Sequence, residues 1–178
     1  MNDFFEEVEL KEVARDIFVT PFLTPFASTL LLGLCQNFTE WKKHTDKYAT
    51  YDLVFEEHYP VYGDILSKGF EQLKFHLEQK GWHLGEYETK ALFAVKYTLG
   101  QSLKRHVDDS YITGSIKLNT NYEGGILTFP RQNFSNQEVP IGNLIVWPSQ
   151  ITHPHLSSKI KSGEKYSITI WSDSKKSS

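Results

Sequence analysis

The feature that most constrains the fold is a change of sequence period near Thr89. From there onward the chain is a series of short β-branched or aromatic runs, and turn residues separate one run from the next. The runs cover residues 91–97, 103–107, 112–118, 125–129, 144–147 and 166–171. Roughly six to eight short strands that follow helices predict an α+β chain whose sheet part is a sandwich or jelly roll.

The first half of the sequence has helical spacing. Thr24-Pro25 is typical of an N-cap followed by a first-turn proline, and it predicts a helix that continues to Phe38. A second helix is predicted over residues 61–80, because apolar residues recur there at helical spacing and Gly81 follows at a C-cap position. We expect both helices to pack as a scaffold against the sheet.

Composition and charge exclude several classes of protein. A single cysteine, Cys35, rules out an intrachain disulfide framework and any zinc or iron–sulfur site built from cysteines. The net charge of −3 and the lack of a Lys/Arg cluster argue against a nucleic-acid partner. The acidic N-terminus lacks the features of a signal peptide, and the longest apolar stretch, residues 26–35, is too short to span a bilayer. We therefore expect a cytoplasmic protein without a membrane partner.

The triplet His106-Val107-Asp108 is the strongest candidate for a metal site. Residues two apart on a strand project from the same face, so the imidazole and the carboxylate can approach one metal together. His153 and His155 offer two candidates for a third ligand. Two histidines and one carboxylate on one face of an octahedron form the arrangement of non-haem Fe(II) oxygenases. Taken alone, however, the triplet occurs by chance in many proteins.

Further elements follow the triplet in a fixed order. They are a Leu-Asn strand end at 118–119, the hairpin Glu123-Gly124-Gly125, a strand from Gly142 to Pro148, and Lys165, ten positions after His155. Together with the triplet they resemble the Fe(II)/2-oxoglutarate-dependent dioxygenases. The closest likeness is to the prolyl and lysyl hydroxylase branch, that is, the catalytic domains of prolyl 4-hydroxylases and procollagen lysyl hydroxylases. The resemblance runs from about Phe93 to Trp171.

The resemblance implies roles for individual residues. His106, Asp108 and His155 would ligate Fe(II). His155 is preferred to His153, because the family's basic residue lies ten positions after the distal histidine. That residue, Lys165, would bind the far carboxylate of 2-oxoglutarate, with lysine as in the prolyl hydroxylases where the lysyl hydroxylases carry arginine. Tyr97 would hydrogen-bond the cosubstrate.

Lys117 has two interpretations. Alternation along residues 112–118 places Thr113, Ser115 and Lys117 on one face of a strand, with apolar residues on the other. A polar face with a lysine suits a cavity wall, where Lys117 would be a second partner for the cosubstrate carboxylate. The same lysine can instead point to solvent, and we favour that interpretation.

The fold and activity implied by the resemblance are those of a single domain over residues 1–178. Supporting helices would occupy about 1–85, and a double-stranded β-helix (jelly roll) about 86–172. The expected activity is hydroxylation of a prolyl or lysyl side chain in a protein or peptide, with release of succinate and CO2. Fe(II), 2-oxoglutarate and O2 would be required, with ascorbate as a possible reductant. An intact Asp108 argues against halogenation, which needs a small residue there. The alternatives are a hydroxylase of a free amino acid or other small metabolite, and a non-catalytic metal-binding jelly roll.

Overall fold

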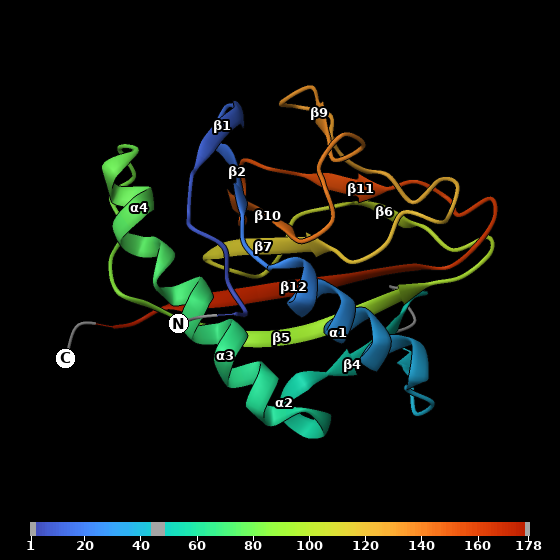
Figure 1. Cartoon of the computed structure of the whole chain (residues 1–178). Coiled ribbons are helices and arrows are strands. Elements are labelled where there is room, and N and C mark those ends of the chain that lie inside the picture. The colour runs from blue at the N-terminus through green and yellow to red at the C-terminus, as the bar shows by residue number, and fades with distance from the viewer. Residues whose placement is uncertain (1–2, 44–48, 177–178) are drawn as a thin grey trace.

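Two antiparallel β-sheets form the framework of the protein, as seen in a computed structural model that describes residues 3–43 and 49–176. The large sheet has eight strands in the order β1-β2-β10-β7-β12-β5-β4-β3. The small sheet has four, in the order β6-β11-β8-β9. The two sheets lie on either side of a shared interior (Figure 1). From β5 to β12 the chain passes back and forth between the sheets, with β6, the β8–β9 hairpin and β11 in the small sheet and β5, β7, β10 and β12 in the large one.

The elements follow the chain in this order. The strands are β1 (Lys11–Ala14), β2 (Ile17–Pro21), β3 (Lys42–Lys43), β4 (Tyr51–Val54), β5 (Tyr87–Tyr97), β6 (Leu103–His106), β7 (Ile112–Lys117), β8 (Leu127–Phe129), β9 (Phe134–Ser135), β10 (Asn143–Pro148), β11 (His155–Ser157) and β12 (Lys165–Ser174). The helices are α1 (Pro25–Asn37), α2 (Phe55–His58), α3 (Pro60–Glu71) and α4 (Leu73–Gln79).

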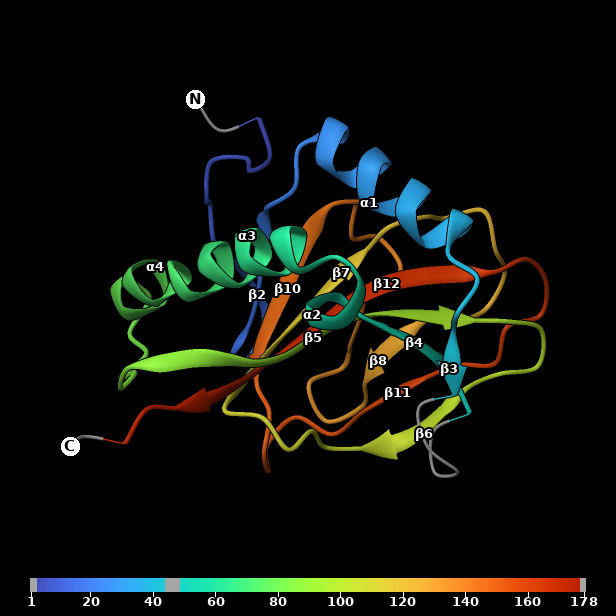
Figure 2. The same cartoon turned by 90° about the horizontal axis from the view of Figure 1, so that it is seen from below.

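The helices lie against one face of the large sheet, and the small sheet lies on the other side (Figure 2). The main core fills the space under the helices, where Phe70 of α3 packs with Ile116 of β7 and Ile168 of β12. Gly114 permits this close approach, because a Cβ at that position would lie 2.8 Å from the Phe70 ring. The helices therefore support the sheet that carries half of the pocket described below.

Both predicted helices are present, the second in two parts. Thr24 caps α1, since its side-chain oxygen accepts a hydrogen bond from the Ala27 amide at 3.1 Å. The predicted helix over 61–80 becomes α3 and α4, which meet at Gln72. Gln72 keeps a right-handed helical backbone (φ −66°, ψ −16°), so the interruption is local. Gly81 follows with a φ of +94°, a conformation that suits a helix end.

The description of residues 1–85 as a helical part is wrong in one respect, because four strands lie among the described residues of this range. β2 extends the large sheet by pairing with β10, and β4 pairs with β5 on the opposite side. In β2 the side chains of Ile17, Phe18 and Thr20 are all buried. Such a strand, covered on both faces, lacks the alternation by which strands are identified in a sequence.

The alternation predicted for β7 is confirmed. Ile112 and Ile116 lie in the core beneath the helices, whereas Thr113, Ser115 and Lys117 line a pocket on the opposite face. The polar face of this central strand is thus directed at the small sheet. Among the described residues, no helix has the length and apolar character needed to cross a membrane.

Candidate active site

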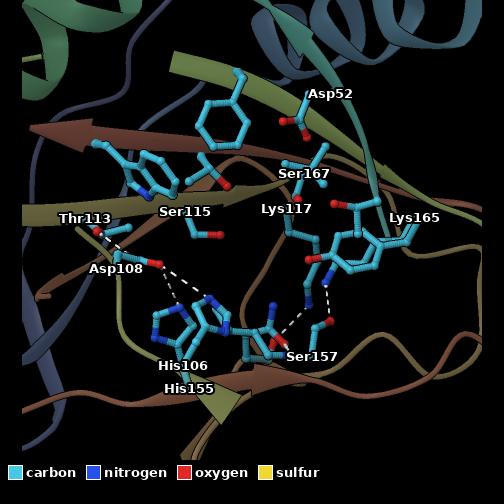
Figure 3. Close-up of a pocket in the computed structure, with 18 of the residues that line it drawn as sticks. Asp52, His106, Asp108, Thr113, Ser115, Lys117, His155, Ser157, Lys165 and Ser167 are labelled. Atoms are coloured by element: carbon cyan, nitrogen blue, oxygen red, sulfur yellow. Dashed lines mark hydrogen bonds and ion pairs between the residues drawn. The ribbon is translucent and has the colours of Figure 1, made fainter. Parts of the chain in front are cut away.

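A pocket lies between the two sheets (Figure 3). Its walls come from β4, β5, β7, β10 and β12 of the large sheet and from β6, β8 and β11 of the small one. All six residues singled out from the sequence line this pocket: Tyr97, His106, Asp108, Lys117, His155 and Lys165. The fold thus brings together side chains that lie up to 68 positions apart in the chain (Tyr97 to Lys165).

Three of these residues form a cluster able to hold a metal. His106 ends β6 and His155 begins β11, and the two residues are direct partners in the antiparallel pairing of these strands. Asp108 follows two positions after His106. Its Oδ1 atom lies 3.4 Å from Nε2 of His106 and 3.5 Å from Nε2 of His155. One ligand atom from each residue lies within 4.8 Å of the others.

The other ring nitrogens explain why both Nε2 atoms face the carboxylate. Nδ1 of His106 lies 2.6 Å from the carbonyl oxygen of Lys104, and Nδ1 of His155 lies 3.0 Å from that of His153. A carbonyl only accepts hydrogen bonds, so each Nδ1 carries a hydrogen, and Nε2 is the ring nitrogen that remains to ligate a metal. The two Nε2 atoms and the Asp108 carboxylate thus converge on one point, where they could ligate a single cation. This donor set suits Fe(II).

Asp108 is held as a carboxylate. Burial by itself would raise the pKa of this group, but the hydrogen bonds and charges of His106 and His155 outweigh burial and hold the pKa well below its usual range. The side chain is therefore an anion at neutral pH, which is the form that ligates a metal.

His153 lies outside the cluster. Its Nε2 lies 3.0 Å from the carbonyl oxygen of Arg15, in the turn between β1 and β2, and its Nδ1 lies 2.7 Å from the Thr152 hydroxyl. The His153 ring thus contacts the N-terminal hairpin, while its backbone carbonyl orients His155. Of the two late histidines, His155 is the one that the structure places beside His106 and Asp108.

A buried cation lies at another part of the pocket wall. Lys165 begins β12 and is 5% exposed. Its ammonium donates hydrogen bonds to the carbonyl oxygen of Gly125 at 2.7 Å and to the Ser157 hydroxyl at 3.2 Å. In the described part of the chain, no carboxylate forms an ion pair with it. Burial, and then the charge of Lys117, lower the pKa of Lys165 to about 7.

Gly125 makes room for this lysine. Its φ is +62°, and a Cβ there would lie 2.5 Å from Cδ1 of Ile160 and 3.0 Å from Cδ of Lys165. Both the backbone conformation and the space therefore favour glycine. Glycine at this position of the Glu123-Gly124-Gly125 hairpin thus allows the backbone carbonyl of residue 125 to lie within hydrogen-bonding distance of the Lys165 ammonium.

Tyr97 lies beside Lys165 and is buried. The two residues are partners across β5 and β12, and the ammonium lies 4.4 Å from the centre of the ring. Burial raises the pKa of the Tyr97 hydroxyl, so the group stays protonated and can donate a hydrogen bond.

Lys117 does not point to solvent, which corrects the interpretation favoured from the sequence. The residue is 8% exposed, and its ammonium donates to the backbone carbonyls of Asn136 at 2.9 Å and Val139 at 2.8 Å. A longer contact of 3.4 Å reaches the carbonyl of Gln137. These carbonyls belong to the connection between β9 and β10. Because this connection lies about 20 positions after Lys117 in the chain, the contact could not be predicted from the sequence. Lys117 therefore holds this connection against the pocket.

Some pocket residues were not identified from the sequence. Asp52 and Thr50 come from β4 and the position before it, a strand that the sequence pattern did not reveal. Ser157 was missed although a signal exists, because it lies two positions after His155 and shares its strand face. Trp147 and Trp171 also line the pocket.

A family model matches the stretch of the chain that contains the site. Residues 92–173 match the family described as the 2OG-Fe(II) oxygenase superfamily. This stretch contains the three clustered residues, Lys165 and the other residues singled out from the sequence. No curated protein sequence matches the chain.

Several solved structures share the fold. A viral collagen prolyl hydroxylase from Paramecium bursaria Chlorella virus-1, solved with 2OG, is 18% identical with a TM-score of 0.67, and the match covers 93% of this chain and 100% of that one. A Pseudomonas putida prolyl-4-hydroxylase is 18% identical with a TM-score of 0.70, covering 90% and 94%. A Trichoplax adhaerens prolyl hydroxylase, solved with a peptide fragment of hypoxia inducible factor, is 18% identical with a TM-score of 0.63, covering 88% and 83%.

The sequence match and the fold agree with the donor set found in the pocket. Fe(II), 2-oxoglutarate and O2 are the cofactor and cosubstrates of this family, and its members are enzymes. The family match over residues 92–173, the fold shared with prolyl hydroxylases and the donor set of the cluster together support a 2OG-Fe(II) oxygenase similar to the prolyl hydroxylases.

Proposed function

We propose that this protein hydroxylates a prolyl or lysyl side chain in a protein or peptide. The observation that carries the proposal is the combination, in one pocket, of the His106–Asp108–His155 cluster with a buried lysine that lacks a carboxylate partner among the described residues. The first fits Fe(II) and the second fits a carboxylate of the cosubstrate. The two sheets would be the halves of a jelly roll, and the whole chain would act as one domain.

The three clustered residues would hold the metal, each by one atom. When bound, Fe(II) supplies oxidation by O2, in which 2-oxoglutarate becomes succinate and CO2 while one oxygen atom enters a C–H bond of the substrate. The protein's own contribution is to orient both imidazoles through the backbone carbonyls of Lys104 and His153. It also encloses the reacting groups, since Asp108 and His155 are both buried. Ascorbate would serve as a reductant.

Lys165 would bind the far carboxylate of 2-oxoglutarate. Its buried ammonium gains a full charge partner when the cosubstrate arrives, in place of the two neutral acceptors it has now. The Tyr97 hydroxyl, which stays protonated, would donate a further hydrogen bond. Lys117 would add positive potential at this part of the pocket.

The choice of a peptide substrate rests on the neighbours that share the fold. One is described as a collagen prolyl hydroxylase, and another was solved with a peptide fragment. Lysine at position 165 favours the prolyl hydroxylase pattern over the lysyl one. The alternative substrate is a free amino acid, and the experiment on substrate class compares it with peptides.

The experiment is an anaerobic titration of the purified protein with Fe(II) and then 2-oxoglutarate. The expected result is the weak visible charge-transfer band of the chelate, which the variants His106→Ala and His155→Ala lose. His83→Ala, which removes an exposed histidine, serves as the control and keeps the band. A folded wild-type protein that binds Fe(II) but forms no band would contradict the proposal.

The substrate class is tested under turnover conditions. Peptides that contain proline or lysine are compared with the free amino acids, and the product is detected by mass spectrometry as the gain of one oxygen atom. Peptide hydroxylation supports the proposal. Hydroxylation of free amino acids alone would move the function to the small-molecule alternative.

A further inference from the structure

The two carboxylate oxygens of Asp108 have different partners. Oδ1 faces the Nε2 atoms of His106 and His155. Oδ2 instead accepts a hydrogen bond from the Thr113 hydroxyl, at 3.1 Å. Figure 3 shows both sets of contacts on opposite sides of the carboxylate. Only one of the two oxygens is therefore directed at the centre of the cluster.

A second hydroxyl supports this contact. The Ser149 hydroxyl donates to the oxygen of Thr113 at 2.5 Å, while its contact with the Trp147 carbonyl is much longer, at 3.4 Å. A carboxylate only accepts, so the hydrogen of Thr113 goes to Asp108 and that of Ser149 goes to Thr113. The two bonds run in one direction, and each strengthens the other. Thr113 and Ser149 are each 1% exposed, so water does not compete for these bonds.

The pair of hydroxyls also links the connection between β6 and β7 to the large sheet. Thr113 lies on β7, where its backbone pairs with Trp147 of β10 and Trp171 of β12, so it is embedded in the large sheet. Ser149 directly follows β10. His106 and His155, by contrast, lie on paired strands of the small sheet. Asp108 lies in the connection from β6 to β7, and the hydroxyl pair ties that connection to the large sheet.

We infer that Thr113, supported by Ser149, is a positioning residue that keeps Asp108 a one-oxygen metal ligand. The inference rests on the proposed function, because it assumes that Asp108 ligates Fe(II). Two histidines and a carboxylate that binds through one oxygen leave three open positions, and the chelating cosubstrate needs two of them. Without the bond from Thr113, Oδ2 is free to turn toward the metal and to occupy one of those positions.

The test uses Thr113→Val, which keeps the branched shape and removes the hydroxyl. Fe(II) affinity, measured by anaerobic titration, should change by less than about threefold, because all three ligands remain. Affinity for 2-oxoglutarate, measured by the charge-transfer band, should fall about tenfold, the order expected when a hydrogen bond to a charged group is lost. Thr113→Ser keeps the hydroxyl and should restore wild-type affinity.

Ser149→Ala provides an independent measurement. It should weaken cosubstrate binding by about threefold in the wild-type background and have no effect in the Thr113→Val background, because Ser149 acts through Thr113. Circular dichroism and thermal unfolding of each variant confirm that it is folded.

The outcomes separate this inference from the proposed function. A wild-type protein that forms no complex with Fe(II) and 2-oxoglutarate would overturn both. A wild-type protein that binds normally, with Thr113→Val binding equally well, would overturn the positioning role alone. The positioning role would also be overturned if the losses of 2-oxoglutarate affinity caused by Thr113→Val and Ser149→Ala were additive in the double variant.

Discussion

The ammonium nitrogen of Lys165 lies 4.4 Å from the centre of the Tyr97 ring, and the two residues are paired across β12 and β5. The ring face stabilises a cation, but much less than a carboxylate does. Burial, and then the charge of Lys117, lower the pKa of Lys165 to about 7. The lysine therefore loses its charge near neutral pH in the ligand-free protein.

Binding of 2-oxoglutarate should depend on pH for this reason. Below pH 7 Lys165 is charged and the affinity should be constant. Above pH 7 Lys165 is mostly neutral and has to take up a proton from solution when the anion binds. The dissociation constant of 2-oxoglutarate should therefore rise by up to about tenfold per pH unit. Other groups that face the ammonium are Tyr97, which stays protonated, and Lys117. Titrations from pH 6.5 to 9 measure the effect.

The matched variant for this prediction is Lys165→Arg. Guanidinium stays charged at every pH in the range, so this variant should bind the cosubstrate with no pH dependence. A dissociation constant of the wild-type protein that stays level up to pH 9 would show that Lys165 keeps its charge in the empty pocket.

Lys165→Met should stabilise the ligand-free protein while it abolishes cosubstrate binding. At pH 7 the free energy of unfolding should increase by about 1 kcal/mol, because a buried cation without a carboxylate partner is replaced by an apolar side chain of similar length. The pKa of Lys165 in the folded state lies below its ordinary value of 10.5, so the unfolded chain binds more protons between pH 7 and 10. Wild-type stability should therefore rise over this range, and the advantage of the variant should shrink.

Urea unfolding at pH 7 and pH 9.5 measures both quantities. Lys161→Met, at an exposed position, is the control and should show neither effect. A Lys165→Met protein less stable than wild type at pH 7 would mean that the contacts to Gly125 and Ser157 outweigh the cost of burying the charge.

Lys117→Met should loosen the connection between β9 and β10. The ammonium holds the carbonyls of Asn136 and Val139, and without it these buried acceptors lose their partner. We expect a loss of about 1–3 kcal/mol in the free energy of unfolding and faster proteolysis within residues 136–139. Lys159→Met, at an exposed position, is the control.

The same variant separates two roles of Lys117. If Lys117 acts only through the connection, the affinity for 2-oxoglutarate should fall in step with the loss of proteolytic protection. A large loss of affinity with the connection still protected would identify Lys117 as a direct partner of the cosubstrate.

Gly125→Ala should damage the Lys165 end of the pocket. A methyl group there would meet Ile160 and Lys165, and the backbone has a positive φ, so we expect a loss of about 1–3 kcal/mol in stability together with weaker cosubstrate binding. Gly85→Ala is a matched control, because a methyl group at that position would have no neighbouring atom within 4 Å and the backbone φ is not positive. Equal stability of the two variants would show that the hairpin can shift to accommodate a side chain.

The residues that sequence analysis singled out and the structure brings together share a local signal. His106 and Asp108 are two apart in the chain, and the alternation along β7 placed Thr113, Ser115 and Lys117 on one face, which the structure shows to be the pocket face. Spacing alone left His153 and His155 as alternatives. The preference for His155 came from the resemblance, and the structure shows its physical basis, since His155 is the residue paired with His106.

The features that the sequence did not reveal depend on distant parts of the chain. Lys117 was assigned to solvent because its acceptors, the carbonyls of residues 136–139, carry no sequence signature. β2 was missed because Phe18 and Ile17 are covered on opposite faces by layers that come together only in the folded protein. Asp52 lines the pocket because β4 pairs with β5, and this pairing joins segments that lie far apart in the sequence.

The two sheets should differ in their stability against local unfolding. The large sheet contains the long strands β5 and β12, of 11 and 10 residues, and has helices on one face, whereas the small sheet consists of strands of two to four residues, and no described helix packs on it. Amide protons of β6 and β11 should therefore exchange with solvent at a lower free-energy cost than those of β7 and β12. His106 and His155 would then belong to the half that opens first, while Asp108 is hydrogen-bonded to a residue of the half that should open last. Local opening of the small sheet would thus take the cluster apart without unfolding the molecule, and exchange rates at β6 and β11 would report how much of the protein is ready to receive a metal.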